Sequence, residues 1–125
     1  MQFEVTDADI ASTLGTGDVP VLATSRLVTW MEATTVAAAA HFLADGETSV
    51  GVGVRVEHRR PTPLGGRVDV SAETAGPSAD RRLTFALQAF DSSGELIGTG
   101  EIDRAIVERE PFLQRATASA GNRPE

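Results

Sequence analysis

A single change of periodicity limits the fold of this chain more than any other feature. Residues 22–46 place apolar side chains on one face at helical spacing and end in a glycine, the usual helix stop. Four later segments alternate at strand spacing: residues 49–60, 67–76, 81–94 and 95–110. The short turns that join them predict antiparallel hairpins between successive strands. With a short N-terminal strand added, this order predicts an α+β fold, in which a curved antiparallel sheet of about five strands wraps around a central helix.

The predicted helix carries a carboxylate within its apolar face. We expect the helix to begin near Ser25 and to end at Asp45, which places Glu32 among leucine, methionine and valine side chains. The opposite face is rich in alanine, which predicts that other elements cover the helix on most sides. A buried, unpaired carboxylate would cost several kcal/mol, so Glu32 should be paired, protonated or facing a cavity.

The first long strand predicts a histidine on the same side as the helix. In residues 49–60 the alternation puts four valines and His58 on one face, and Gly51 on the other. The valine face should point inward, because apolar residues mark the buried side of a strand. His58 and Glu32 are therefore expected on the same side of the sheet.

Composition excludes several classes of function. The 125 residues fit one domain, over residues 1–112, followed by a flexible tail over residues 113–125. A net charge of −7 without a basic stripe argues against nucleic acid and membrane partners. The chain has no cysteine, and His41 and His58 are its two histidines, so we expect no metal site and no cofactor. An acidic N-terminus without an apolar run predicts a cytoplasmic protein.

Three segments together resemble the hotdog-fold thioesterases of the fluoroacetyl-CoA thioesterase-like family. They are VLATSRLVTWMEA, VGVGVRVEHRRPTPLGG and LTFALQAFDSSGELIGTGEIDRAIVE, and the resemblance covers roughly residues 3–113. The family pattern has a threonine in LAT, a glutamate eight residues later, a strand that begins with VG, and a histidine before a TPxG turn. The matching residues here are Thr24, Glu32, Gly51 and His58.

This chain departs from the family pattern at three places. Ser25 stands where the family often has proline, and Arg59 and Arg60 stand where small or apolar residues are usual. The loop GTGDVPVLA has no aromatic residue that could form an apolar lid, so nothing in it indicates a fluorinated acyl group.

The resemblance implies an acyl-CoA thioesterase for a small acyl thioester. Glu32 would be the nucleophile or the base that activates water, His58 would carry a proton to the departing thiolate, and Thr24 would be a positioning hydroxyl. The structural alternatives are a glutamate whose head reaches solvent, a structural strand histidine and a helix cap.

The same resemblance implies substrate-binding residues and a partner. The backbone amide near Gly51 would face the thioester oxygen, or the glycine would only let the helix approach. Arg59 and Arg60 would meet the phosphates of coenzyme A, or remain solvated surface charges. An open sheet edge predicts a homodimer or a tetramer, and the carrier of the acyl group could be coenzyme A or an acyl carrier protein.

Two other functions fit the same residues. A hotdog hydratase acting on enoyl-CoA would also combine a carboxylate with a histidine. A non-catalytic module that binds acyl-CoA or another small ligand would keep the cavity without turnover. Thiol release, hydration of a double bond and binding alone distinguish the three.

Overall fold

The computed structural model describes the backbone of residues 1–121 and the side-chain surroundings of residues 1–118. The predicted strands form close to their expected positions, and the α+β hotdog architecture is confirmed. In chain order the elements are β1 (Gln2–Glu4), η1 (Asp7–Asp9), α1 (Ala11–Leu14), α2 (Thr24–Ala39), η2 (Ala40–Phe42), β2 (Glu47–His58), β3 (Arg67–Glu73), β4 (Arg82–Asp91), β5 (Leu96–Glu108) and α3 (Arg109–Gly121).

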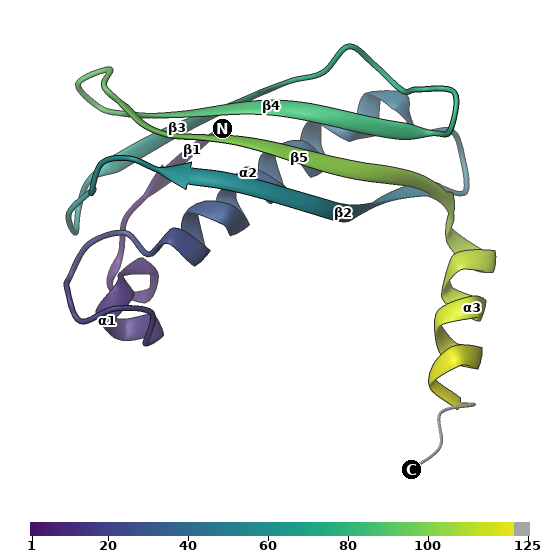
Figure 1. Cartoon of the computed structure of the whole chain (residues 1–125), viewed down its shortest axis with the longest axis horizontal. Helices are drawn as coiled ribbons and strands as arrows, with labels where there is room; N and C mark the ends of the chain where they lie inside the picture. The colour runs from purple at the N-terminus through teal and green to yellow at the C-terminus, as the bar shows by residue number, and fades with distance from the viewer. Residues whose placement is uncertain (122–125) are drawn as a thin grey trace.

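The described strands form one antiparallel sheet in the order β1-β3-β4-β5-β2. Figure 1 shows this sheet curling over α2, which lies against its concave side. Two pairs of neighbouring strands, β3 with β4 and β4 with β5, form the expected hairpins. The expectation of a hairpin between β2 and β3 was wrong, because β2 pairs with β5 and lies at the opposite side of the sheet from β3. Residues 59–66 cross between these two strands.

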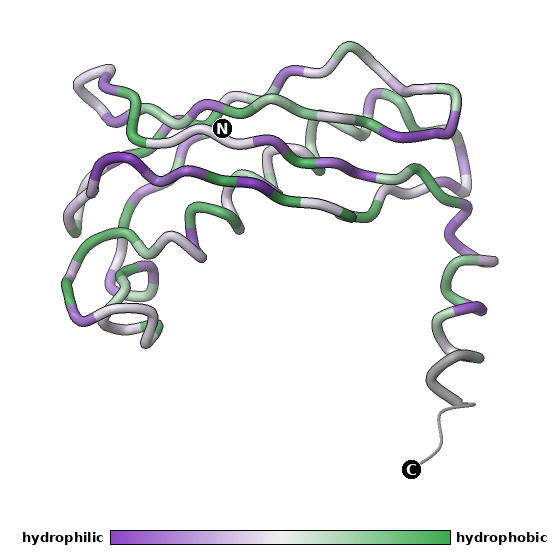
Figure 2. Tube along the Cα trace, viewed as in Figure 1, coloured by the Kyte–Doolittle hydropathy of each residue, from purple (hydrophilic) through white to green (hydrophobic). Residues whose placement is uncertain are grey.

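The core lies between the sheet and one face of α2. Leu27, Met31 and Thr35 of α2 are fully buried, and β4 alternates buried and exposed residues along most of its length. Figure 2 shows the matching alternation of hydropathy along the strands. A Cβ at Gly98 would lie 3.1 Å from the Leu27 side chain, and one at Gly100 would lie 3.0 Å from Met31 Sδ. These glycines of β5 therefore let the helix approach the sheet closely.

The helix differs from its prediction at its far end and on its outer face. It ends at Ala39 and tightens into the 3₁₀ turn η2 instead of continuing to Asp45. The Glu47 N–H donates to the Ala44 carbonyl, and the Ala44 N–H donates to the Glu47 carboxylate. These two bonds close a turn that leads directly into β2. The expected cover on most sides was also wrong, because the alanines of the outer face are exposed in the single chain: Ala33, Ala37, Ala40 and Ala44.

Val52 forms a β-bulge in β2. Gly51 pairs with Arg104, and Gly53 pairs with the adjacent Asp103, so Val52 has no partner across the ladder. An extra residue in one strand reverses the side to which the following residues point. The two halves of β2 therefore have opposite alternation.

The bulge corrects the predicted faces of β2. Gly51 faces α2, because a Cβ on it would lie 3.0 Å from Glu32 Oε2. Beyond the bulge, Val56 packs against the core, and His58 lies on the same inward side as Val56. Val50 lies on the outer side, and the prediction that it shares a face with His58 was wrong. The inward position of His58 itself was predicted correctly.

Part of the segment predicted to be a flexible tail lies in a helix. The helix α3 covers Arg109–Gly121 and points away from the sheet (Figure 1). The Arg109 N–H donates to the Gly46 carbonyl, which fixes the start of this helix to the turn before β2. The flexibility of residues 113–125 stays a prediction, and residues 122–125 lie outside the described part of the chain.

Candidate active site

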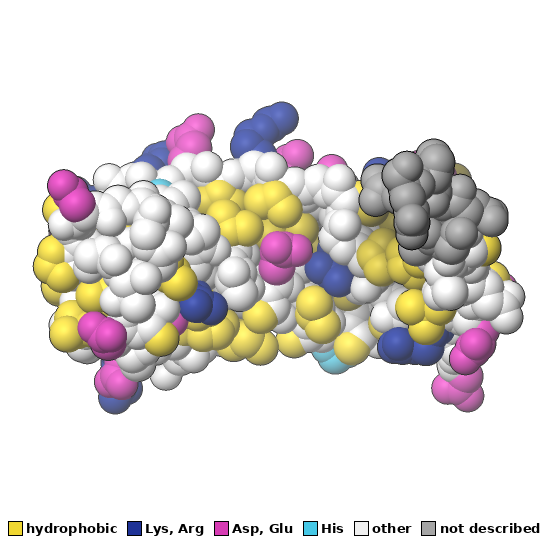
Figure 3. All heavy atoms as spheres, turned by 90° about the horizontal axis from the view of Figure 1, so that it is seen from below, with side chains coloured by type: hydrophobic (Ala, Val, Ile, Leu, Met, Phe, Trp, Pro, Cys, Tyr) yellow, Lys and Arg dark blue, Asp and Glu magenta, His cyan; other side chains and the backbone are white. Residues whose placement is uncertain are grey.

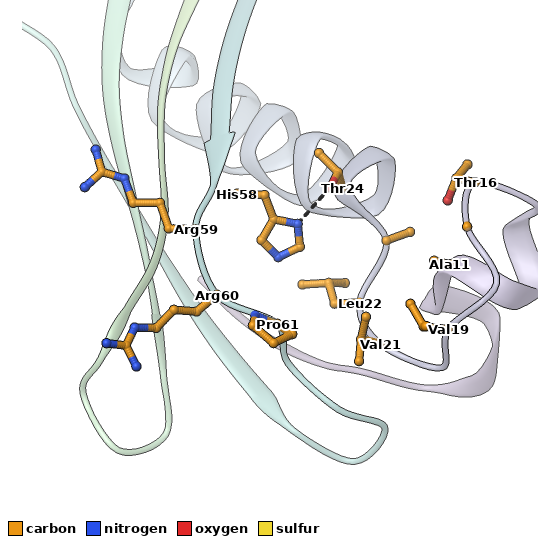
Figure 4. Close-up of a pocket in the computed structure, with 12 residues that line it drawn as sticks. Ala11, Thr16, Val19, Val21, Leu22, Thr24, His58, Arg59, Arg60 and Pro61 are labelled. Carbon is orange, nitrogen blue, oxygen red and sulfur yellow. Dashed lines mark hydrogen bonds between the residues drawn. The ribbon is translucent and has the colours of Figure 1, made fainter.

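Thr24 and His58 are in direct contact at the start of α2. Ala23 is the N-cap residue of the helix, and Thr24 is its first helical residue. The Thr24 hydroxyl does not cap the helix, and its Oγ1 lies 2.9 Å from His58 Nδ1 (Figure 4). Their hydrogen bond joins a helix start to a strand end, which agrees with the resemblance and not with the capping role of the threonine.

His58 is the last residue of β2 and is half-buried. Burial lowers the pKa of its imidazole below the ordinary value of 6.5, and the Arg60 backbone partly offsets this effect. His58 Nε2 is buried and has no hydrogen-bond partner among the described residues. A neutral imidazole in this place can exchange a proton through either ring nitrogen.

The first turn of α2 is tied to the N-terminal segment. The Ala23 N–H donates to the Asp9 carbonyl at 2.9 Å, and Arg26 Nε lies 3.2 Å from Asp9 Oδ1. The other carboxylate oxygen of Asp9 accepts hydrogen bonds from the Thr6 N–H and hydroxyl, both at 2.8 Å. Several bonds converge on Asp9, so they hold the backbone from which the Thr24 hydroxyl projects.

A cavity of about 320 Å³ opens beside the pair. Figure 4 shows Thr24 and His58 between two different walls, with the apolar loop that precedes α2 on one side and two arginines on the other. The residues that line the cavity are Ala11, Thr16, Gly17, Val19, Val21, Leu22, Ala23, Thr24, His58, Arg59, Arg60 and Pro61.

Glu32 lies in a second cluster with Gly51 and Arg104. The position of a Cβ on Gly51 lies 3.0 Å from Glu32 Oε2 and 3.5 Å from an Arg104 nitrogen. Arg104 is buried, and it donates hydrogen bonds to the Ser49 hydroxyl at 2.9 Å and the Ser49 carbonyl at 3.0 Å. Burial lowers the pKa of Arg104, and the charge of Glu32 acts in the opposite direction. The carboxylate on the apolar face therefore has a cation nearby.

Sequence reasoning missed Arg104, although the signal was present. Ile102, Arg104 and Ile106 follow one another at strand spacing, and all three are buried. A charge between apolar residues on the inward face of a strand needs a partner, and Glu32 was the unpaired carboxylate of the opposing helix.

The two clusters are separate within one chain. Thr24 and Glu32 stand eight residues apart on α2, which corresponds to roughly 12 Å at the helical rise of about 1.5 Å per residue. Glu32 is not among the residues that line the cavity beside Thr24 and His58. The single chain therefore brings Thr24 to His58, and Glu32 to Gly51, but does not join the two pairs.

Arg59 and Arg60 lie at the edge of the cavity and engage acidic neighbours. Arg59 forms an ion pair with Glu57 at 3.2 Å, and Arg60 forms one with Glu95 at 2.5 Å. Their side chains extend away from His58 in Figure 4. A phosphate group would have to compete with these carboxylates for the arginines.

No group of three or more acidic, histidine or cysteine side chains that could hold a metal ion occurs among residues 1–121. Over the same described residues, no helix has both the length and the apolar character needed to cross a membrane.

A curled antiparallel sheet around one long helix is the hotdog fold, and solved hotdog structures superpose on this chain. A Thermus thermophilus protein described as a thioesterase superfamily member is 26% identical, with a TM-score of 0.86 over 98% of this chain and 92% of its own. The fold and the site thus define a hotdog protein of the thioesterase type.

The chain belongs to the fluoroacetyl-CoA-specific thioesterase family, which matches residues 5–110. The fluoroacetyl-CoA thioesterase of Streptantibioticus cattleyicolor is 39% identical over 92 residues, which span 74% of this chain and 65% of that protein. A crystal structure of a fluoroacetyl-CoA thioesterase is 31% identical, with a TM-score of 0.84 over 99% of this chain and 93% of its own. A variant with the same identity and TM-score, matched over 95% of this chain and 96% of its own, was solved with fluoroacetate and CoA.

Proposed function

We propose that this protein hydrolyses an acyl-CoA thioester to a carboxylic acid and free thiol. The observation that carries the proposal is the contact between Thr24 Oγ1 and His58 Nδ1 in the wall of a cavity with one apolar and one basic side. Family membership and the thioesterase activity of the 39% identical relative support the same reaction.

The chemistry needs an attacking oxygen and a proton for the departing sulfur. Glu32 either attacks the carbonyl carbon or takes a proton from the attacking water. When Glu32 acts as the base, the proton that it takes from water passes to neutral His58, which is held by the Thr24 hydroxyl, and from His58 to the departing thiolate. When Glu32 attacks directly, the attack releases no proton: the thiolate takes its proton from solvent, and neutral His58 accepts one from the water that then hydrolyses the anhydride on Glu32 and returns it to solvent. Mass spectrometry of acid-quenched enzyme distinguishes the two routes, since only direct attack leaves an acyl adduct on Glu32.

A homodimer supplies the missing contact between the two clusters. The strand β2 is an edge strand, and the exposed fractions of Val52 and Val54 are both 46%. Val36 on α2 is 52% exposed. Figure 3 shows hydrophobic side chains gathered on this underside, with an acidic and a basic side chain among them. The two clusters are too far apart to meet within one chain. A second copy that covers this surface would bring its Glu32 toward Thr24 and His58 of the first copy.

The remaining substrate contacts follow from the same arrangement. Gly51 leaves space beside Glu32 for the thioester, since any side chain there would meet the carboxylate. Arg59 and Arg60 stand at the edge of the cavity and would meet the phosphates of coenzyme A by exchanging their carboxylate partners.

The test is thiol release from a panel of acyl-CoA esters, with wild type and Glu32→Gln compared. We expect the variant to lose about 10³-fold in kcat, by analogy with the loss of other essential acid or base groups. Glu101→Gln, an exposed glutamate of β5, is the matched control and should retain activity. No release from any ester would refute the proposal, and hydration of an enoyl-CoA or tight binding without turnover would identify which rival is correct.

Complementation tests whether the site is shared between two copies. Thr24→Val and Glu32→Gln should each be inactive alone. When the two variants are mixed under conditions that exchange subunits, a mixed dimer contains one intact combination of Thr24, His58 and Glu32, and activity should return. Persistent inactivity of verified mixed dimers would contradict the shared site.

A further inference from the structure

The side of the cavity that lies away from the two arginines is lined by uncharged residues. The residues that line it between α1 and the start of α2 are Ala11, Thr16, Gly17, Val19, Val21, Leu22 and Ala23. Figure 4 shows Val19 and Val21 on the opposite side of the Thr24–His58 pair from the two arginines. A thioester held at this pair, with its phosphates toward the arginines, would direct its acyl group toward the valines.

The valine wall is fixed by backbone hydrogen bonds on both sides. The Val21 carbonyl accepts from the Ala11 N–H at 2.8 Å, and the Val19 carbonyl accepts from the Ser12 N–H at 3.2 Å. The next residue, Leu22, donates its N–H to the Thr62 carbonyl at 2.8 Å. The loop is therefore tied to α1 and to the turn after β2, so the cavity exists before substrate binds.

The size of the cavity exceeds what an acetyl group can fill. Its volume of about 320 Å³, which includes the side lined by His58, Arg59 and Arg60, corresponds to roughly ten non-hydrogen atoms at the ~30 Å³ that a water molecule takes in the liquid. An acetyl group would occupy about a third of that space. The unfilled part would hold water against an apolar wall and contribute little to binding.

We infer that the substrate carries an uncharged, branched or aryl acyl group that fills this cavity, and not an acetyl-sized group. The inference rests on the proposed thioesterase activity. A charged acyl group would be desolvated here without a partner, because no charged side chain lies on the valine side. The pantetheine arm is a poorer occupant, because its amides would need hydrogen-bond partners that these apolar side chains do not offer.

The first measurement is kcat/KM for thiol release from acetyl-CoA, isovaleryl-CoA and phenylacetyl-CoA. We expect kcat/KM to rise at least tenfold from the acetyl to the phenylacetyl ester. A preference for acetyl-CoA, or equal values for the three esters, would overturn the inference and leave the thioesterase proposal standing. No thiol release from any ester would instead overturn the thioesterase proposal and this inference with it.

Variants that fill the cavity then test whether it holds the acyl group or a part of the substrate that all the esters share. Val19→Phe suits this purpose because Val19 is 49% exposed, so a larger side chain there does not strain the core. We expect it to lower kcat/KM at least tenfold for phenylacetyl-CoA and less than twofold for acetyl-CoA. Val21→Phe, at a second point of the same wall, should act in the same direction.

The control is Leu113→Phe, which adds an aromatic ring at an exposed position on α3 and should change neither ester. Circular dichroism and thermal unfolding of each variant establish that it is folded. If folded Val19→Phe and Val21→Phe lower kcat/KM equally for both esters, the cavity holds a part of the substrate that the esters share, and the inference is overturned.

Discussion

Thr24 Oγ1 and His58 Nδ1 lie 2.9 Å apart, although 33 residues separate them along the chain. Thr24 begins α2 and His58 ends β2, and the two ends meet because the last residues of β2 pack beside the start of the helix. Ala23 is the N-cap residue of the helix, and the Thr24 hydroxyl bonds to the His58 imidazole instead of to the helix backbone. The helix therefore begins without a side-chain cap.

Removal of the Thr24 hydroxyl should lower the rate of thiol release. Thr24→Val keeps the branched shape but cannot bond to His58, and we expect a loss of about 10²-fold or more in kcat. Thr24→Ser should retain much of the activity, because it keeps the oxygen. The control is Thr29→Val on the same helix, whose hydroxyl donates to the Ser25 carbonyl. Equal kcat in Thr24→Val and wild type would exclude the role assigned to this hydroxyl.

Two glycines of β2 form a matched pair of substitutions. A Cβ at Gly51 would lie 3.0 Å from Glu32 Oε2, so Gly51→Ala must move the carboxylate by a few tenths of an ångström. Since a misplacement of about 1 Å can cost roughly 10²-fold in rate, we expect this smaller shift to cost up to about tenfold. A Cβ at Gly53 would lie at an ordinary 3.5 Å from Asp103 Oδ2, so Gly53→Ala should be nearly silent. The measurement is kcat for thiol release by both variants, with thermal unfolding to establish that each is folded. Comparable losses in the two would mean that general disturbance of the strand is the cause.

The lowered pKa of His58 predicts how the rate depends on pH. Since burial favours the neutral imidazole, the acidic limb of kcat/KM should be centred below pH 6.5, at the lowered pKa of His58 in the folded protein. His58→Gln should remove this acidic limb together with most of the activity. His41→Gln, at an exposed histidine, should leave the limb in place. An acidic limb centred above pH 6.5 would contradict the assignment.

The same pKa shift predicts the sign of a stability change. The unfolded chain binds a proton at His58 near pH 6.5, whereas the folded protein binds it only at lower pH. The contribution of neutral His58 to the free energy of unfolding is thus complete above pH 6.5 and is lost as the pH falls toward the folded pKa. Urea unfolding across this range should show a smaller decline in His58→Gln than in wild type, and an unchanged decline would refute the prediction.

Arg104→Met should destabilise the protein. The substitution removes both hydrogen bonds to Ser49 and takes the nearby cation away from Glu32, and buried groups left without partners cost about 1–3 kcal/mol. Arg55→Met, at an exposed arginine of β2, should change the free energy of unfolding by less than about 0.5 kcal/mol.

A double variant tests the coupling between Arg104 and Glu32. Glu32→Gln removes the charge that Arg104 faces, so adding it to Arg104→Met should cost less than the two single losses combined. Urea unfolding of the four proteins gives this difference, and strict additivity would show that the two charges do not interact.

Most of the fold was predictable because strand spacing and turn residues agree along the second half of the chain. The bulge was not, because valine and glycine alternate through residues 50–54 and hide an extra residue in a perfect pattern. The helix end was missed for a similar reason, since alanine favours helix strongly and the turn between Ala44 and Glu47 depends on local hydrogen bonds.

The site was predictable in part. Family resemblance pointed to Thr24 and His58, and the structure places them in contact. The distance from this pair to Glu32 was not predictable from a motif, because a motif gives spacing along the chain and not whether the residues of one copy can meet. Arg104 could have been found from the sequence, because it stands between Ile102 and Ile106 at strand spacing, whereas its closeness to Gly51 depends on the pairing of β5 with β2.

The bulge at Val52 determines which positions of β2 an engineer can change without altering the interior. Before it, odd positions of β2 such as Gly51 face the helix, whereas after it even positions such as Val56 and His58 do. A mutant library that randomised every second residue along the whole strand would therefore alter the interior in one half and only the solvent side in the other. Deletion of Val52 would leave a regular strand in which Gly51 and His58, then six positions apart, still face inward, whereas a strand that kept Val52 without the bulge would place them on opposite faces.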